Sequence, residues 1–182
     1  MLNGLLRKSF IAVLVSLGIG NTPLSAQGHP QERHGFWLTL GLGAGSLGCD
    51  ECSSRSTGVS GQLSLGGTIT PRLLLGASSN GWTKQESGVT LSMGTLTALV
   101  KFYPVLTGGF YLSGGLGIAN ISASTTGFGS ASQTGTGAVL GLGYDIRVAK
   151  NFSLTPYLNG VGASFDGSQV NFSQIGLGFS WH

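Results

Sequence analysis

The chain has 182 residues, of which 33 are glycine; 41 % are hydrophobic and only 8 % are charged, whereas charged residues make up about a quarter of a typical soluble domain. Disorder is excluded because it requires low hydrophobicity and high charge, and collagen is excluded because the glycines do not recur at every third position. The net charge of +3 includes Arg7 and Lys8 of a candidate leader, and no basic stripe with interleaved aromatic residues occurs, which excludes nucleic-acid binding.

The first 26 residues have the features of a secretory signal peptide. Arg7 and Lys8 supply the positive charge, an apolar run follows over 10–19, and the small pair Ser25-Ala26 offers a cleavage site near Ala26. A run of about ten apolar residues is too short to span about 30 Å of hydrocarbon, which argues against a membrane anchor. We therefore expect an exported protein with a short periplasmic lead-in over 27–34 and one domain over 35–182.

The rest of the chain alternates between apolar and small or polar residues, as strands with two different faces do. Eight such segments of about ten residues follow one another, the length that a tilted membrane strand needs. Their apolar faces fall within 36–44, 59–69, 73–77, 96–102, 110–118, 138–148, 152–158 and 175–181. The mature chain contains no apolar stretch long enough for a transmembrane helix, so a membrane location requires a closed barrel.

The fourth segment is irregular. Val89, Leu91 and Met93 share one face, whereas the apolar residues from Leu96 to Phe102 share the other. A bulge near Gly94 or Thr95 would restore the alternation. Alternatively, the strand begins only at about Gly94, and the sequence leaves both interpretations open.

The connections alternate in length, with tight turns at 70–72, 104–109 and 149–151 and longer polar loops at 48–56, 83–88, 122–133 and 164–169. In outer-membrane barrels the short turns are periplasmic. Aromatic residues, which favour the membrane interface, gather at the rim with the short turns. The predicted periplasmic girdle consists of Phe36, Phe102, Phe110, Tyr144, Phe152, Phe179 and Trp181.

On these features the chain resembles the superfamily of small outer-membrane β-barrels, which includes the OmpA membrane domain and the OmpX- and OmpW-like proteins. The resemblance rests on the leader, the eight alternating segments and the terminal strand 174–182, in which Trp181 takes the place of the usual final aromatic residue and His182 follows it. It implies an all-β, eight-stranded antiparallel up-and-down transmembrane barrel in the outer membrane of a Gram-negative-type envelope. It also implies two partners: outer-membrane lipid, and the barrel-assembly machinery that reads the terminal strand.

Two groups of residues are candidate sites. Cys49 and Cys52 are the only cysteines, and in an exported protein we expect them to form a disulfide that staples the first long loop. A zinc site normally needs four ligands, so metal binding together with Asp50 and Glu51 is the weaker interpretation.

The second candidate is a charge cluster in the lumen. Asp145 and Arg147 face inward, and Lys101 shares their layer. Such charges can line a pore or pair with one another and plug it; the narrow interior of an eight-stranded barrel favours the plug. Inward glycines pose the same choice, since they either leave a water path or lie beneath rings such as Tyr111 and Tyr157.

We predict that the protein is not an enzyme and has no cofactor or metal. The only histidines are His29, His34 and His182, near the two ends of the chain, so no base stands beside a nucleophile. A soluble lipocalin-like barrel is the main alternative fold, but its outer face would carry charges. We expect a structural or surface-interaction role through external loops; the alternative is a narrow, porin-like channel for ions or small solutes.

Overall fold

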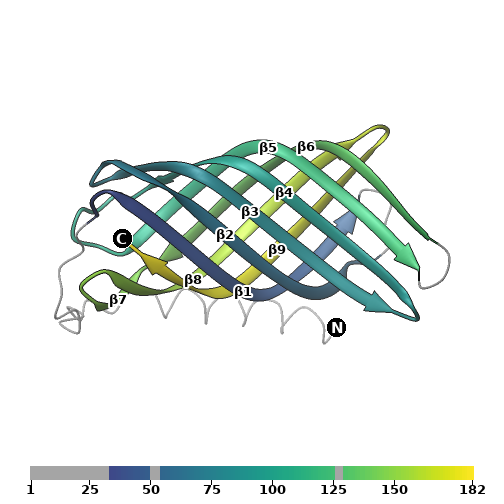
Figure 1. The fold of residues 1–182 in the computed structure, drawn as a ribbon, viewed down its shortest axis with the longest axis horizontal. Coiled ribbons are helices and arrows are strands. Elements are labelled where there is room, and N and C mark those ends of the chain that lie inside the picture. Colours follow the sequence, from purple (N-terminus) through teal and green to yellow (C-terminus); the bar gives the residue numbers. More distant parts are fainter. Residues whose placement is uncertain (1–32, 50–53, 126–128) are drawn as a thin grey trace, which may run out of the picture.

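The computed structural model describes residues 33–49, 54–125 and 129–182, which form one antiparallel sheet (Figure 1). Its strands are β1 (Phe36–Cys49), β2 (Ser56–Thr70), β3 (Leu73–Glu86), β4 (Val89–Phe102), β5 (Phe110–Thr125), β6 (Gly129–Tyr144), β7 (Ile146–Ala149), β8 (Phe152–Phe165) and β9 (Ser168–Trp181). The strand order is β6-β5-β4-β3-β2-β1-β9-β8-β7, and β6 also pairs with β8. That last pairing joins the two sides of the sheet and closes it into a barrel.

The segments β6 and β7 belong to one barrel strand. Asp145 separates them, and both pair with β8. The nine segments therefore make eight barrel strands, which confirms the predicted closed, antiparallel, up-and-down barrel. The predicted signal peptide (1–26) and residues 27–32 of the predicted lead-in lie outside the described residues.

The structure contains no helix, within the described part of the chain, that is long and apolar enough to cross a membrane.

The two faces of the wall are those that the alternation predicts. In β1, Leu42 is 71 % exposed on the outside, whereas Thr39 is completely buried inside. The same holds around the barrel, where Leu116, Leu140 and Ile175 are exposed and hydroxyl and amide side chains face inward. The apolar face is therefore on the outside, opposite to a soluble barrel with an apolar interior.

The barrel has two ends that differ in their chemistry. We call the end with the connections 71–72, 103–109 and 150–151 the turn end, and the opposite end the hairpin end. At the turn end the outward side chains are apolar. Toward the hairpin end they change to Ser, Thr, Asn and Gln, for example from Ile118 to Asn120 and Ser122 along β5.

The prediction of long loops at the hairpin end is wrong for three of the four connections. Strands continue through most of 83–88, 122–133 and 164–169, so β3 and β4 are joined by Ser87 and Gly88 alone. Both of these residues have positive φ, as the tight turns of β-hairpins require. Where the outward face turns polar, a strand loses the apolar alternation that reveals it in the sequence, although its backbone pairing continues.

Neither interpretation of the fourth segment is correct. β4 runs without a bulge from Val89, which pairs with Glu86, to Phe102, which pairs with Leu73. Met93 faces inward like Lys101, and its buried side chain joins an apolar cluster inside the hairpin end. Apolar residues change face along β4 because the interior is apolar near the hairpin end, while the outer wall is apolar near the turn end.

Three layers fill the barrel. The apolar cluster inside the hairpin end contains Trp82, Met93, Val170 and Phe172, all buried. Amide side chains occupy the middle, and charged and aromatic side chains occupy the turn end. The core of this molecule is therefore its lumen.

Aromatic rings cover several of the inward glycines, as the sequence suggests. A Cβ on Gly143 would lie 2.5 Å from the Tyr111 hydroxyl oxygen, and a Cβ on Gly41 would lie 2.6 Å from the Tyr157 ring. Glycine leaves the space that these rings occupy. The inward glycines thus serve packing and do not widen the lumen.

Candidate functional site

Asp145 is the centre of the charged layer at the turn end. It lies where β6 passes into β7, and its side chain is completely buried. The Tyr103 hydroxyl donates a hydrogen bond to Oδ2 (2.8 Å), and the Thr155 hydroxyl donates one to Oδ1 (2.7 Å). Donors on both oxygens are what a buried carboxylate needs to remain ionised, because burial without them disfavours the charged form.

Lys101 is the cation that a chain of hydroxyl groups connects to Asp145. The Lys101 ammonium donates to the Thr39 hydroxyl (3.0 Å), which is hydrogen-bonded to Ser180 (2.9 Å). Ser180 is hydrogen-bonded to Thr155 (2.8 Å), which donates to Asp145. Five barrel strands thus contribute to one buried polar connection between opposite charges.

Two aromatic rings enclose the ammonium group of Lys101. Its nitrogen lies 4.5 Å from the ring centroid of Trp37 and 4.7 Å from that of Tyr111. Ring faces attract cations at such distances, and the attraction is larger where water is excluded. The rings therefore stabilise the charge and also close the lumen around it.

Arg33, which precedes β1, covers the turn end of the lumen. Its guanidinium lies 3.6 Å from the ring centroid of Tyr103, and it donates hydrogen bonds to the carbonyl oxygens of Leu106 and Gly108. Only 1 % of Arg33 is exposed. The segment before the barrel and the connection 103–109 therefore close this end together.

The predicted lumen charges are placed as follows. Lys101, Asp145 and Arg147 are all inside the barrel and at least 96 % buried, with exposed fractions of 3 %, 0 % and 4 %. Lys101 and Asp145 meet through the hydroxyl chain. Arg147 donates to the backbone oxygen of Lys150 in the β7–β8 turn (2.6 Å) and so also secures the barrel end.

Sequence reasoning missed three residues of this layer: Arg33, Tyr103 and His182. Tyr103 could have been found, because it comes two residues after the inward-facing Lys101, just past the end of β4, and alternate residues of a strand face the same side. Arg33 gives no signal, since a polar segment before the first strand has no periodicity.

His182 was expected outside any site because it is the last residue. It lies beyond the end of β9 with its Nε2 3.4 Å from Oδ2 of Asp145. Burial lowers the pKa of His182 below its ordinary value, although the neighbouring carboxylate acts in the opposite direction. The ring is therefore neutral at neutral pH, and the cations of the layer are lysine and arginine.

Amide side chains seal the middle of the lumen. The Asn159 amide donates to Gln62 (2.7 Å), and the Gln174 amide donates to Asn80 (2.8 Å). The cavity that remains between these amides and Lys101 has a volume of about 10 Å³. This is too small for a continuous water path, since one water needs about that much space by itself.

The residues of the predicted aromatic girdle lie on the outer wall near the turn end. Phe36, Phe179 and Trp181 are more than half exposed, and the rings of Phe152 and Phe179 stack with their centroids 5.6 Å apart. Phe110 pairs across strands with Tyr144. The remaining member, Phe102, is 43 % exposed.

The structure describes one of the two cysteines of the predicted disulfide. Cys49 is the last residue of β1, and Cys52 lies outside the described residues. The connection between β1 and β2 spans 50–55, and Arg55 secures its far side by hydrogen bonds to Ser46 and Asn171. The described part of the chain contains no group of three His, Cys, Asp or Glu side chains that could hold a metal ion.

Among the described residues, one strand edge at the hairpin end has no paired neighbour. Pairing between β6 and β8 stops at Thr136 and Ser164, because β8 turns back into β9 at residues 166–167. Residues 129–135 of β6 therefore pair with β5 alone, and 129–134 are exposed. In Figure 1 this start of β6 reaches well beyond the β8–β9 hairpin.

Solved structures with the same architecture come from other bacteria. Neisserial surface protein A is 16 % identical, with a TM-score of 0.58 and coverage of 82 % of this chain and 98 % of that one. Ail, the attachment invasion locus protein of Yersinia pestis, is 17 % identical, with a TM-score of 0.56 and coverage of 82 % and 100 %. Another Ail structure, with the heparin analogue sucrose octasulfate, has a TM-score of 0.58, 17 % identity and the same coverage. These likenesses show the fold.

Sequence comparison identifies the family. No curated protein matches the chain. A family model for the outer membrane protein beta-barrel domain matches residues 11–182, which is nearly the whole chain. The closed barrel, its apolar outer wall and this match agree, and the chain belongs to the outer membrane protein β-barrel family.

Proposed function

We propose that this outer-membrane barrel is a surface-contact protein, and that its contact element is the free edge of β6 over residues 129–135. In this proposal the signal peptide is cleaved near Ala26, the turn end with its aromatic girdle is periplasmic, and the hairpin end faces outward. A disulfide between Cys49 and Cys52 holds the first external connection. The proposal replaces the expected long loops by hairpins as the contact surface.

The filled lumen supports contact over conduction. Charged, amide and apolar layers follow one another along the barrel, and Arg33 covers the turn end. The cavity near Lys101 measures about 10 Å³. A channel would require several of these layers to move, whereas contact at the hairpin end requires none of them to change.

The free edge of β6 is the single observation that carries the proposal. An unpaired strand edge offers a row of backbone N–H and C=O groups to another strand, and proteins usually protect such edges with charged residues or proline. The sequence of 129–135 contains neither. Its side chains are those of Gly, Ser, Ala, Gln and Thr, all uncharged, and the residues 129–134 are exposed.

The chemistry of this edge fits an extended peptide segment. In β-strand addition, main-chain hydrogen bonds supply the affinity and alternating side chains supply the selectivity. Ser130, Ser132 and Thr134 point outward, and Ala131 and Gln133 face the opposite way. A partner strand with small polar side chains on one face therefore suits the site.

The test uses a peptide that already fits β6. A labelled peptide with the sequence of residues 119–125, the segment of β5 that pairs with 129–135, is titrated against the purified barrel in detergent micelles. Successive residues direct their backbone groups to opposite sides of a strand. Of the separate variants Ala131→Pro and Ser132→Pro, one therefore removes an N–H from the free edge and the other removes an N–H from the pairing with β5.

We expect the wild type to bind the peptide. Amide exchange identifies which of the two proline variants keeps its pairing with β5, and we expect that variant to lose peptide binding. Ser122→Lys is the matched control for Ser132→Lys, because the two serines are cross-strand partners and only Ser132 lies on the free edge. Absence of binding to the wild type, or equal binding by all these variants, contradicts the proposal.

A further inference from the structure

A second surface feature is a hollow in the outer wall across β2, β3 and β4. Its volume is about 510 Å³, within the range of about 300–1,000 Å³ typical of small-ligand sites. Three outward glycines form its floor: Gly61, Gly81 and Gly94. They lie in direct register, since Gly61 pairs with Gly81 and Gly81 pairs with Gly94.

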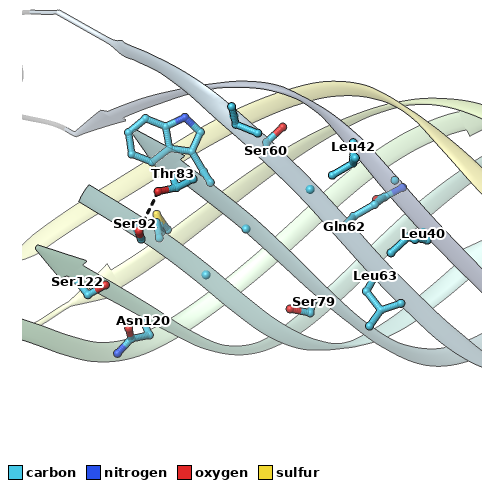
Figure 2. A pocket seen from close by; sticks show the side chains of 17 residues that line it. Leu40, Leu42, Ser60, Gln62, Leu63, Ser79, Thr83, Ser92, Asn120 and Ser122 are labelled. Carbon is cyan, nitrogen blue, oxygen red and sulfur yellow. Dashed lines mark hydrogen bonds between the residues drawn. The ribbon is translucent and has the colours of Figure 1, made fainter. Parts of the chain in front are cut away.

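The hollow lies on the border between apolar and polar wall. The cross-strand row on the side of the turn end contains Leu40, Leu63 and Leu96, interrupted by Ser79. The row on the other side contains Val59 followed by Thr83, Ser92 and Ser122, and the hydroxyls of Thr83 and Ser92 are hydrogen-bonded at 3.0 Å. Figure 2 shows this hydroxyl lip and the leucines on opposite sides of the hollow.

Packing does not require glycine at two of the three floor positions, whereas a Cβ on Gly61 would lie 3.3 Å from the Gly41 carbonyl oxygen. A Cβ on Gly81 would meet nothing within 4 Å, and one on Gly94 would come no closer than 3.9 Å to any atom. The hollow is therefore open space on the outer wall, bordered by apolar groups and hydroxyls.

We infer that this hollow binds a membrane glycolipid through its acyl chains and uncharged sugar hydroxyls. The leucine side continues the lipid-facing wall of the barrel, so acyl chains already cover it. The hydroxyl lip lies where a lipid passes from chain to head group. The described residues that line the hollow include no Lys, Arg, Asp or Glu, so the site offers nothing to pair with a phosphate.

A second copy of the chain fits this space less well. Another hollow of about 500 Å³ lies across β5, β6, β8 and β9, where Leu116 and Ala138 give way to Thr136 and Ser164. It too lies on the border between apolar and polar wall. A rigid second barrel would fill the hollow only with a ridge of matching shape at the same height in the membrane. A flexible lipid adapts to the shape.

The experiment measures lipids retained by the full barrel in native mass spectrometry. Mixed micelles contain a neutral diacyl glucosyl glycerol and phosphatidylglycerol with the same chains. Gly81→Leu fills the hollow, and Gly67→Leu is the matched control, because Gly67 also faces outward on β2 and its Cβ would meet nothing within 4 Å. The double variant Thr83→Val with Ser92→Ala removes the hydroxyl lip and keeps the cavity. Heat-dependent migration on gels verifies that each variant is folded.

The wild type is expected to retain the glucolipid in preference to phosphatidylglycerol. Gly81→Leu should weaken glucolipid retention about tenfold, the factor that corresponds to 1.4 kcal/mol, and Gly67→Leu should leave it unchanged. The lip variant should retain both lipids about equally. Equal glucolipid retention by the wild type and Gly81→Leu overturns the inference, as does a preference of the wild type for phosphatidylglycerol. A wild-type dimer that Gly81→Leu dissociates assigns the hollow to a second copy instead.

Discussion

Replacing Asp145 by asparagine tests whether the charged layer stabilises the barrel as a unit. The substitution keeps the shape of the side chain, but one carboxylate oxygen becomes an NH₂ group that faces a donor, either the Tyr103 or the Thr155 hydroxyl. Loss of a hydrogen bond to a charged group costs about 1.5–3 kcal/mol. The change also leaves the buried Lys101 without the negative charge at the other end of the hydroxyl chain. We therefore expect Asp145→Asn to lower the free energy of unfolding by about 1.5–3 kcal/mol.

The assay is reversible urea unfolding in lipid vesicles, followed by tryptophan fluorescence and by migration on gels without heating. The double variant Asp145→Asn with Lys101→Met removes both charges, so it should be more stable than Asp145→Asn alone by more than about 1 kcal/mol, a coupling typical of interacting residues. A loss below about 1 kcal/mol for Asp145→Asn, or strictly additive effects in the double variant, would refute the reasoning.

Three further predictions follow from single contacts. Gly66→Ala should destabilise the barrel by about 1–3 kcal/mol, because the new Cβ would overlap the Leu75 carbonyl oxygen. Gly67→Ala is the control: its Cβ would meet nothing within 4 Å, so it should leave the stability in the same urea assay unchanged. Equal effects of the two substitutions would contradict this packing. Burial lowers the pKa of His182, so its contribution to stability should be constant above its ordinary pKa of about 6.5 and fall as the pH drops below it, because protons then bind the unfolded chain preferentially. His182→Gln should remove this slope, and an unchanged slope assigns it to other groups. Thiol titration of the denatured, unreduced protein should find no free thiol, whereas two free thiols exclude the disulfide between Cys49 and Cys52.

The fold could be predicted from the sequence wherever the barrel lies between lipid and a polar interior. Along β1, Leu38, Leu40 and Leu42 alternate with inward residues, and this alternation identifies both the strand and its outer face. Near the hairpin end, where the outward side chains are polar, the alternation of apolar residues no longer identifies a strand. The outward face of β6 carries Ser130, Ser132 and Thr134, so the strand resembles a polar loop in the sequence. The free edge was invisible for that reason.

The charged layer shows a similar limit. The alternation of faces along a strand predicts that Lys101 and Asp145 point inward. Their connection through the hydroxyls of Thr39, Ser180 and Thr155 depends on how neighbouring strands align in the closed sheet. The pairing of β1 with β9 joins the first and last strands of the barrel. The sequence predicts the closure, but no local pattern gives the register of these two strands, and the hydroxyls involved are unremarkable one by one.

Conductance in a planar bilayer tests the central claim, that the lumen is filled and the protein works at its surface. The purified full barrel, verified as folded by its heat-dependent migration, is added to both sides of the bilayer, and current is recorded at several voltages. The account predicts no reproducible open level for the wild type, because the amide layer around Asn80 and the charged layer around Asp145 block the path. A stable, reproducible open level would contradict it and make the narrow channel the function of this barrel.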